Sequence, residues 1–308
     1  MDRADLELFE RSLRHVTERH TGSALDAALE ELGWSEALVD DRRAAVSLLF
    51  DLQGRANATS SAIGALLTAT SGADAVLPAL GTWTQPGEVD GDRVAVRGLT
   101  IGMGRSRLLV VARKGDKDVV VTVPIVELTV REVQGVDPAL GLAEVTGTAT
   151  AAEFGPADWS TSVATCRLAL GHELVGASRK MLELACEHAL EREQFGRPIA
   201  AFQAIRHRLA ETLVAIETAE AMLDGAWLDQ SPLSAAMAKA VAGRGARTAA
   251  RHCQQVLAGI GFTTEHPLHR YIRRVLVLDE LFGSARSLTH DLGAELLRTR
   301  QLPPLLPL

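Results

Sequence analysis

The sequence predicts an α+β protein of 308 residues in which helices, a small β region and a long helical bundle follow one another. Apolar residues recur at helical spacing near both ends of the chain, and short runs rich in β-branched residues fill the middle. The composition, 47% hydrophobic and 23% charged, fits a folded chain with a sizeable core. We expect three domains, at residues 1–72, 73–157 and 158–308, the last with a proline-rich tail.

The N-terminal domain is expected to consist of short helices. Its first helix is indicated by apolar residues at helical spacing, namely Leu6, Phe9, Leu13 and Val16. A second helix near residues 25–32 is predicted to end at Gly33-Trp34, and residues 38–68 supply one or two more.

The β domain is predicted from short apolar runs separated by Gly, Asp and Lys. Three runs are clear, at residues 94–96, 108–112 and 119–123, and a weaker one covers 145–151. Between the first two runs, the glycines of residues 98–105 predict a hairpin turn.

The C-terminal domain is predicted to be a bundle of long helices with breaks at residues 196–198, 229–232 and 259–267. One helix covers 173–191. Gly196 suits a left-handed helix terminus, and Pro198 cannot continue the helix. The next helix, at about 201–228, is expected to direct four side chains inward: Ile205, Leu209, Leu213 and Ile216. The tail, Arg300 to Leu308, holds three prolines and exposes leucines unless it docks on another surface.

Charge and composition exclude several classes of function. A net charge of −7 gives no electrostatic reason to expect a nucleic-acid partner. No apolar run is long enough to span a bilayer, and the acidic N-terminus does not resemble a secretory signal. Cys166, Cys186 and Cys253 lack metal-ligand spacing, so we interpret them as small apolar residues in a reducing cytoplasm.

Residues 192–199, Arg-Glu-Gln-Phe-Gly-Arg-Pro-Ile, form the most informative stretch of the chain, together with Phe202-Gln203. Arg192 is predicted at a helix end beside a tight turn, where a planar guanidinium can grip a pyrophosphate in bidentate fashion. Basic residues also close many helices by satisfying the last carbonyls, which is the alternative for Arg192 taken alone.

A second stretch runs from Cys253 to Arg270 and contains Gln255 and Gly259. Glycine at such a position lets a backbone approach a cofactor closely. The alternatives are that Gly259 and Gly261 merely cap a helix, and that Glu265 and Arg270 form a local ion pair.

Both stretches resemble signatures of the acyl-CoA dehydrogenase family, R-x-Q-F-G-x-P-I followed by F-Q, and Q-x-x-G-G-x-G-Y-x-x-E-x-P-x-x-R. The resemblance implies a helical domain, a β domain and a four-helix bundle. It also implies FAD, with the pyrophosphate and adenosine of a flavin held mainly by a neighbouring subunit lying against six positions: Arg192, Gln194, Phe195, Gln203, Gln255 and Gly259. Ala258 departs from the first glycine of the second signature.

The catalytic base of the family is missing. The E-G-T segment that carries it falls on Phe282-Gly283-Ser284, and a phenyl ring cannot accept a proton. Some members place the base before an R-L pair, which here is Cys166. The residues that surround the flavin ring in the family are also poorly matched. Residues 84–87 match the family's T-E-P loop poorly, and no W-x-T segment follows. We therefore predict no catalytic residue in this chain.

Together these features predict a subunit of a heteromeric acyl-CoA dehydrogenase. It resembles actinobacterial α2β2 enzymes of steroid catabolism, such as cholesterol degradation, in which a homologous subunit carries the catalytic glutamate. The substrate implied is a steroid-derived acyl-CoA. One alternative is a self-sufficient homo-oligomer with Glu280, Asp279 or Glu173 as base. Another is a non-enzymatic scaffold that binds CoA or protein.

Overall fold

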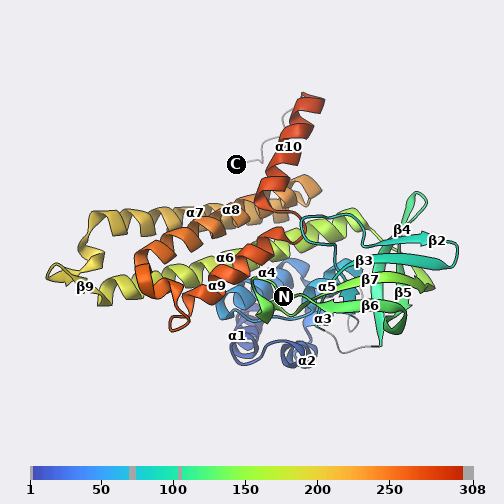
Figure 1. Ribbon diagram of the computed structural model, residues 1–308, viewed down its shortest axis with the longest axis horizontal. Coiled ribbons are helices and arrows are strands. Elements are labelled where there is room, and N and C mark those ends of the chain that lie inside the picture. Colours follow the sequence, from blue (N-terminus) through green and yellow to red (C-terminus); the bar gives the residue numbers. More distant parts are fainter. Residues whose placement is uncertain (1–2, 69–73, 103–105, 301–308) are drawn as a thin grey trace.

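The computed structural model describes residues 3–68, 74–102 and 106–300, and of residues 152–154 it describes the backbone alone. Figure 1 shows a long helical bundle with a twisted β-sheet at one end and the N-terminal helices along one side. The order of helices, sheet and bundle predicted from the sequence is confirmed. The expected boundary between residues 72 and 73 lies outside the described residues, as does the tail after Arg300.

Within the described residues, the N-terminal part has five helices: α1 (Arg3–Arg19), α2 (Ser23–Glu31), α3 (Trp34–Asp40), α4 (Arg42–Ala56) and α5 (Ala62–Thr68). Helix α4 packs closely against the bundle helix α6 (Trp159–Glu191), and each of the two helices has a glycine at the contact. A Cβ added to Gly54 would overlap the Glu173 carbonyl oxygen, and one added to Gly176 would overlap that of Asp51. The α4 and α6 backbones are therefore in direct contact.

Over the described residues, eight strands form one sheet: β1 (Asp74–Val76), β2 (Gly87–Asp90), β3 (Arg93–Ile101), β4 (Arg107–Lys114), β5 (Lys117–Pro124), β6 (Leu128–Glu132), β7 (Leu142–Thr150) and β8 (Ala152–Pro156). The four runs predicted from the sequence lie in β3, β4, β5 and β7. The hairpin turn predicted over 98–105 is wrong for residues 98–101, which pair with β7 as the end of β3. Residues 103–105 lie outside the described residues.

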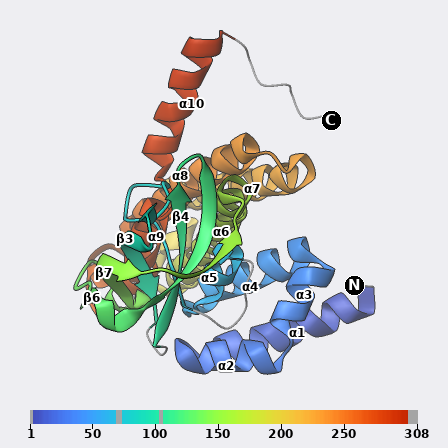
Figure 2. The same cartoon turned by 90° about the vertical axis from the view of Figure 1, so that its right-hand side faces the viewer.

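The bundle consists of α6 (Trp159–Glu191), α7 (Gln203–Asp229), α8 (Pro232–Leu257), α9 (Leu268–Glu280) and α10 (Ala285–Thr299). Helix α6 begins at Trp159, where Asp158 caps the first turn by accepting from the Thr161 amide, and not at residue 173. Buried α6 packs against α4, α7, α8 and α9, whereas α10 projects away from the body (Figure 2).

Helix α7 contradicts one packing prediction. Leu213 was expected inward, but it is 44% exposed, and the neighbouring Thr212 is buried instead. The reason is that α7 lies on the outside of the bundle and packs mainly on α6 and α8. The buried face of α7 is therefore narrower than the spacing of its apolar residues suggests.

Two features are absent from the described residues. None of the helices there is long and apolar enough to cross a membrane. Within the same ranges, no three His, Cys, Asp or Glu side chains are grouped so that they could hold a metal ion.

Candidate functional site

The α6–α7 connection is a tight hairpin built from β9 (Glu193–Gln194) and β10 (Arg197–Pro198). Its two turn residues, Phe195 and Gly196, have φ of 55° and 76°. Two left-handed residues between paired strands make the turn that suits the twist of a hairpin. The prediction of a left-handed Gly196 is therefore confirmed in conformation but wrong in place, since α6 already ends at Glu191.

The hairpin presents its signature residues to solvent. Phe195 is 90% exposed, an unusual exposure for a large apolar ring, and its ring meets that of Phe202 edge-on at 6.1 Å between centroids. The Arg197 guanidinium lies 4.3 Å from the centre of the Phe202 ring. Gln194 and Gln203 are also exposed; the Gln194 amide donates to the Glu193 carbonyl, and the Gln203 amide lies 3.3 Å from His207 Nε2.

Arg192 is exposed at the end of α6. Its backbone closes the helix by donating to the His188 carbonyl, and its own carbonyl accepts from the Ile199 amide. Within the described part of the chain, its guanidinium donates no hydrogen bond to a helix carbonyl, so the helix-closing alternative is not the one seen. Burial, and then the charge of Arg192, lowers the pKa of His188.

The second signature lies at the end of α8. Ala258, with φ of 51° and ψ of −130°, takes the positive-φ position at the helix end where a glycine, Gly259 or Gly261, was expected, and residues 258–262 continue as a 3₁₀ turn. Gln255 and Gly259 are exposed, and a Cβ on Gly259 would meet no atom within 4 Å. The surface above Gly259 is therefore open to a ligand.

The two signatures lie at the same end of the bundle, because α7 runs away from the hairpin and α8 returns toward it (Figure 1). His266, within the second signature, lies near His188 in the last turn of α6. Burial, and then the neighbouring His188, lowers the pKa of His266. All six predicted cofactor-binding positions thus face solvent on one end of the molecule.

The predicted base position lies in the α9–α10 connection. Phe282 is 1% exposed and packs into the core, and its φ of 57° is strained for a residue with a side chain. The Phe282 carbonyl oxygen accepts from Arg167 Nε at 3.1 Å. Position 282 of this loop therefore carries no proton acceptor.

A buried polar clamp holds this loop. Lys239 Nζ donates to the carbonyls of Asp279 and Gly283, at 2.9 and 3.3 Å. The Asp279 carboxylate accepts from the Ala285 amide at 3.0 Å and from Arg247 Nε at 2.6 Å. Burial lowers the pKa of Lys239 to about 8. No pattern in the sequence marks Lys239, because a lysine in an alanine-rich helix is usually expected to be exposed to solvent.

The alternative bases are each engaged in structural contacts. Asp279 belongs to the clamp, and Glu280 accepts from Arg247 Nη2 at 3.0 Å. Glu173 is buried, and its Oε1 lies 3.6 Å from Arg274 Nη1. Burial raises the pKa of Glu173 to about 7, although the charge of Arg274 acts to lower it. Burial also raises the pKa of the Cys166 thiol, which points at the Ile63 carbonyl.

Trp83, which the sequence analysis did not single out, connects the β domain to the loop. Its carbonyl accepts from Trp159 Nε1 at 2.9 Å, and its ring lies 5.2 Å from the Arg167 guanidinium carbon. Nearby, the Gly81 amide donates to the Glu280 carbonyl. In the segment compared with the T-E-P loop, Gln85 donates to Asp118 at 2.6 Å. This segment is therefore committed to contacts within the chain.

A family model described as "Acyl-CoA dehydrogenase, C-terminal domain" matches residues 158–297. Acyl-CoA dehydrogenase IpdE2 of Mycobacterium tuberculosis is 37% identical over 131 residues, which is 42% of this chain and 41% of that protein. Benzylmalonyl-CoA dehydrogenase of Aromatoleum aromaticum is 36% identical over 119 residues, 37% of this chain and 32% of that protein. The aligned segments thus span well under half the length of these relatives.

Solved structures align along almost the whole chain. The Tcur3481-Tcur3483 steroid ACAD aligns with a TM-score of 0.80 at 21% identity, over 96% of this chain and 99% of that one. The ChsE4-ChsE5 complex of Mycobacterium tuberculosis gives 0.79 at 18% identity, over 99% of both chains. Butyryl-CoA dehydrogenase of Megasphaera elsdenii gives 0.75 at 17%, over 95% and 98%. Residues 158–297 thus match the acyl-CoA dehydrogenase C-terminal domain, and the chain as a whole has the fold of these solved structures.

Proposed function

We propose that this chain is the non-catalytic subunit of a heteromeric, FAD-dependent acyl-CoA dehydrogenase and completes the flavin site of a catalytic partner. The observation that carries the proposal is Phe282, a buried ring in the strained loop where the family places its base. The loop is retained and clamped while the proton acceptor is gone. A chain that keeps this architecture without its base is best suited to support chemistry on another subunit.

The residues at the exposed end of the bundle fit a flavin nucleotide. Arg192 offers paired N–H donors to a pyrophosphate, and the amides of Gln194, Gln203 and Gln255 offer further donors and acceptors. Gly259 leaves the backbone open to close approach. These groups bind and orient the dinucleotide half, and FAD, when bound, accepts the hydride from the substrate.

The substrate we propose is a steroid-derived acyl-CoA, and the partner is a homologous subunit that carries the catalytic glutamate in an α2β2 assembly. The support is the similarity to IpdE2 in sequence, and to a steroid ACAD and the ChsE4-ChsE5 complex in fold. The chain's own contribution is to position the cofactor, while abstraction of the α-proton belongs to the partner.

The direct test is acyl-CoA dehydrogenase activity of the chain alone, with added FAD, and of the chain mixed with its partner. We expect no turnover from the chain alone and activity from the complex. Turnover by a preparation in which mass spectrometry finds no partner would overturn the proposal and favour a self-sufficient enzyme. A complex with neither flavin nor activity would favour the binding scaffold.

A further inference from the structure

A groove of about 1080 Å³ lies between α8, the end of α9 and the start of α10. Four arginines line it. Arg244, Arg247 and Arg251 come from one face of α8, and Arg286 comes from the first turn of α10. The whole chain has a net charge of −7, so this positive charge is a local feature of one surface. We refer to these residues as the arginine groove.

Two carboxylates also line the arginine groove, and both are bound to the same arginine. Arg247 Nε donates to the Asp279 carboxylate at 2.6 Å, and Arg247 Nη2 donates to Glu280 at 3.0 Å. The other three arginines of the groove are exposed, and they form no ion pair with any described residue. The groove therefore keeps a net positive charge that no ion pair within the described chain neutralises.

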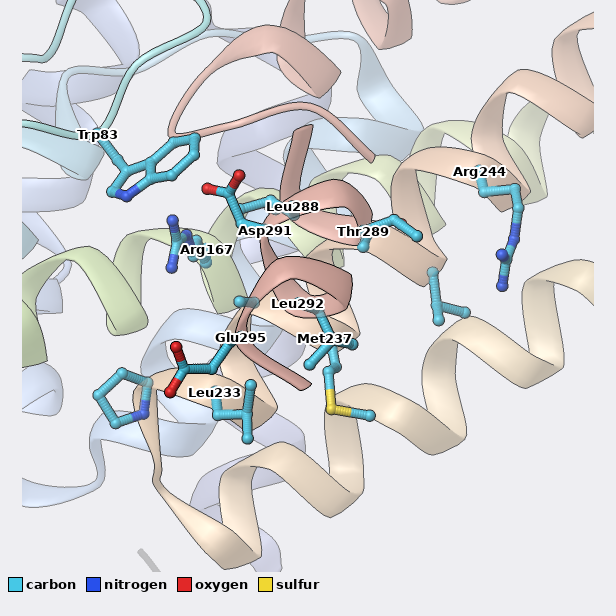
Figure 3. Close-up of a pocket in the computed structure, with 14 residues that line it drawn as sticks. Trp83, Arg167, Leu233, Met237, Arg244, Leu288, Thr289, Asp291, Leu292 and Glu295 are labelled. Carbon is cyan, nitrogen blue, oxygen red and sulfur yellow. The ribbon is translucent and has the colours of Figure 1, made fainter. Parts of the chain in front are cut away.

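A neighbouring cavity of about 400 Å³ does not supply the missing negative charge. It shares Arg244 with the groove and is also lined by Asp291 and Glu295. Figure 3 shows Arg244 at one edge of this cavity, well apart from both carboxylates. Glu295 is bound instead to Arg298 on its own helix. The positive charge of the groove is thus open to a partner from outside the chain.

The spacing of the arginines suits a row of carboxylates better than one small anion. Arg244 and Arg251 are seven residues apart, which is about 10 Å along α8, and Arg286 lies on another helix. A single phosphate group needs donors that converge on it. Arginines spread along a groove are typical of surfaces that receive acidic protein segments, and arginine is enriched at protein interfaces.

We propose that the arginine groove receives an acidic segment of the partner subunit. The inference rests on the proposed function, because it names the chemistry of that partner's contact surface. Arg251 and Gln255 are one turn apart on the exposed side of α8, so the groove continues the surface of the proposed flavin site. Two copies of this chain that paired through the groove would bring the same arginines together across a two-fold axis. Like charges repel, so the groove also disfavours pairing of this chain with itself.

The test is the dissociation of the purified complex on dilution, followed by analytical ultracentrifugation. Arg244→Glu/Arg251→Glu should raise the concentration at which half of the complex has dissociated by about tenfold or more, because two attractive contacts become repulsive. Raising NaCl from about 0.1 M to about 1 M shortens the screening length from about 10 Å to about 3 Å and should weaken the wild-type complex. The same change of salt should not weaken the charge-reversed complex.

Two variants control for net charge and for side-chain loss. Arg11→Glu/Arg19→Glu makes the same change at exposed positions of α1, which lies on the far side of the molecule from α10 (Figure 2), and should assemble like wild type. Arg244→Lys/Arg251→Lys keeps the charge of the groove and should recover most of the assembly. Circular dichroism checks that each variant folds. If the charge-reversed chain does not co-purify with the partner, the neutral pair Arg244→Gln/Arg251→Gln replaces it, with the same direction of effect expected.

Two results would overturn the proposal while the proposed function stands. One is a charge-reversed complex that dissociates like wild type. The other is a charge-reversed complex that loses flavin while its subunits stay together, which would assign the groove to a nucleotide. Activity of the complex tests the proposed function separately. A chain that is active without any partner would refute the proposed function and this inference together.

Discussion

Single side chains carry most of the argument about this chain. Position 282 holds a phenyl ring, which accepts no proton, while Arg167 donates to the Phe282 carbonyl and Lys239 to that of Gly283. The side chains of Arg192 and Phe195, in contrast, are exposed and make few contacts within the chain.

Arg192→Ala should weaken flavin binding by the purified complex. Loss of charge-assisted bonds to the pyrophosphate is expected to cost roughly 1.5–3 kcal/mol, or about ten- to a hundredfold in affinity. Fluorescence titration of the apo-complex with FAD measures the change. Arg206→Ala, which removes another exposed arginine from α7, is the control and should have no effect. Unchanged affinity in Arg192→Ala would remove this residue from the site.

Glu173 should make the stability of the protein pH-dependent. Burial raises its pKa from the usual 4.5 to about 7 in the fold, against the opposing pull of Arg274, with Asp137 nearby adding to the rise. The folded state therefore binds more protons than the unfolded state between these values, so this group lowers stability as pH rises through that window. Urea unfolding from pH 4.5 to 7.5 should show a decrease in wild type that is smaller in Glu173→Gln, whose amide resembles the protonated acid. Parallel profiles for the two proteins would contradict the assignment.

At the scale of elements, the hairpin between α6 and α7 combines strain with exposure. Phe195 holds a left-handed conformation that an asparagine adopts more easily, and its ring is almost entirely in solvent. A residue that is unfavourable for the turn and gains no burial within the chain is best explained by a contact outside it.

Phe195→Asn should therefore raise the stability of the chain by up to about 1 kcal/mol while it weakens the assembly with partner and flavin. Thermal melting of the variant and flavin retention by the complex measure the two effects. Phe262→Asn is the matched control, since Phe262 is 73% exposed but lacks a left-handed backbone, and it should show no gain in stability. A Phe195→Asn complex as tight as wild type would show that the ring has no external contact.

The elements predicted from the sequence are those with long periodic patterns. The bundle helices and the strands β3, β4, β5 and β7 follow from apolar spacing, because burial on one face enforces it. Strands β1, β2 and β6 were missed since three to five residues carry too little pattern. Leu213 was misplaced because periodicity does not show how wide a face the neighbouring helices cover.

The residues of the candidate site also fall into two groups, those that a sequence pattern marks and those that it does not. Arg192 and Gln255 stand out in sequence because short fixed spacings join them to turn residues. Trp83, Lys239 and Arg247 act through tertiary contacts with positions dozens of residues away, such as Lys239 with Gly283. No local pattern marks such residues: the packing of α8 against α9 brings Lys239 and Arg247 to the loop, and Trp83 reaches it through Trp159 and Arg167.

For the whole molecule, the exposed signature surface predicts the stoichiometry of the assembly. We expect co-expression with the partner to give an α2β2 complex with two FAD. The reason is that Gln85, in the segment of this chain compared with the T-E-P loop, is hydrogen-bonded to Asp118 and does not offer a second site for a flavin ring. Flavin absorbance against protein mass on the purified complex gives the ratio. Expression alone should give aggregated protein, since obligate interfaces typically bury about 2,000 Å² or more. Four FAD per tetramer, or a stable flavin-loaded homotetramer, would contradict this assembly.

The buried Arg274 joins the three regions of the chain. From α9 it donates to the Ala58 carbonyl at 2.7 Å and to Asp137 at 2.6 Å, and it lies near Glu173. During vectorial synthesis on the ribosome, Ala58 and Asp137 emerge long before Arg274. These acceptors therefore lack their cationic partner during most of translation. The contacts of the N-terminal and β regions around Arg274 can form only after α9 has been synthesised. A chain truncated before α9 should therefore be incompletely packed in all three regions, and not at its end alone, and should bind chaperones.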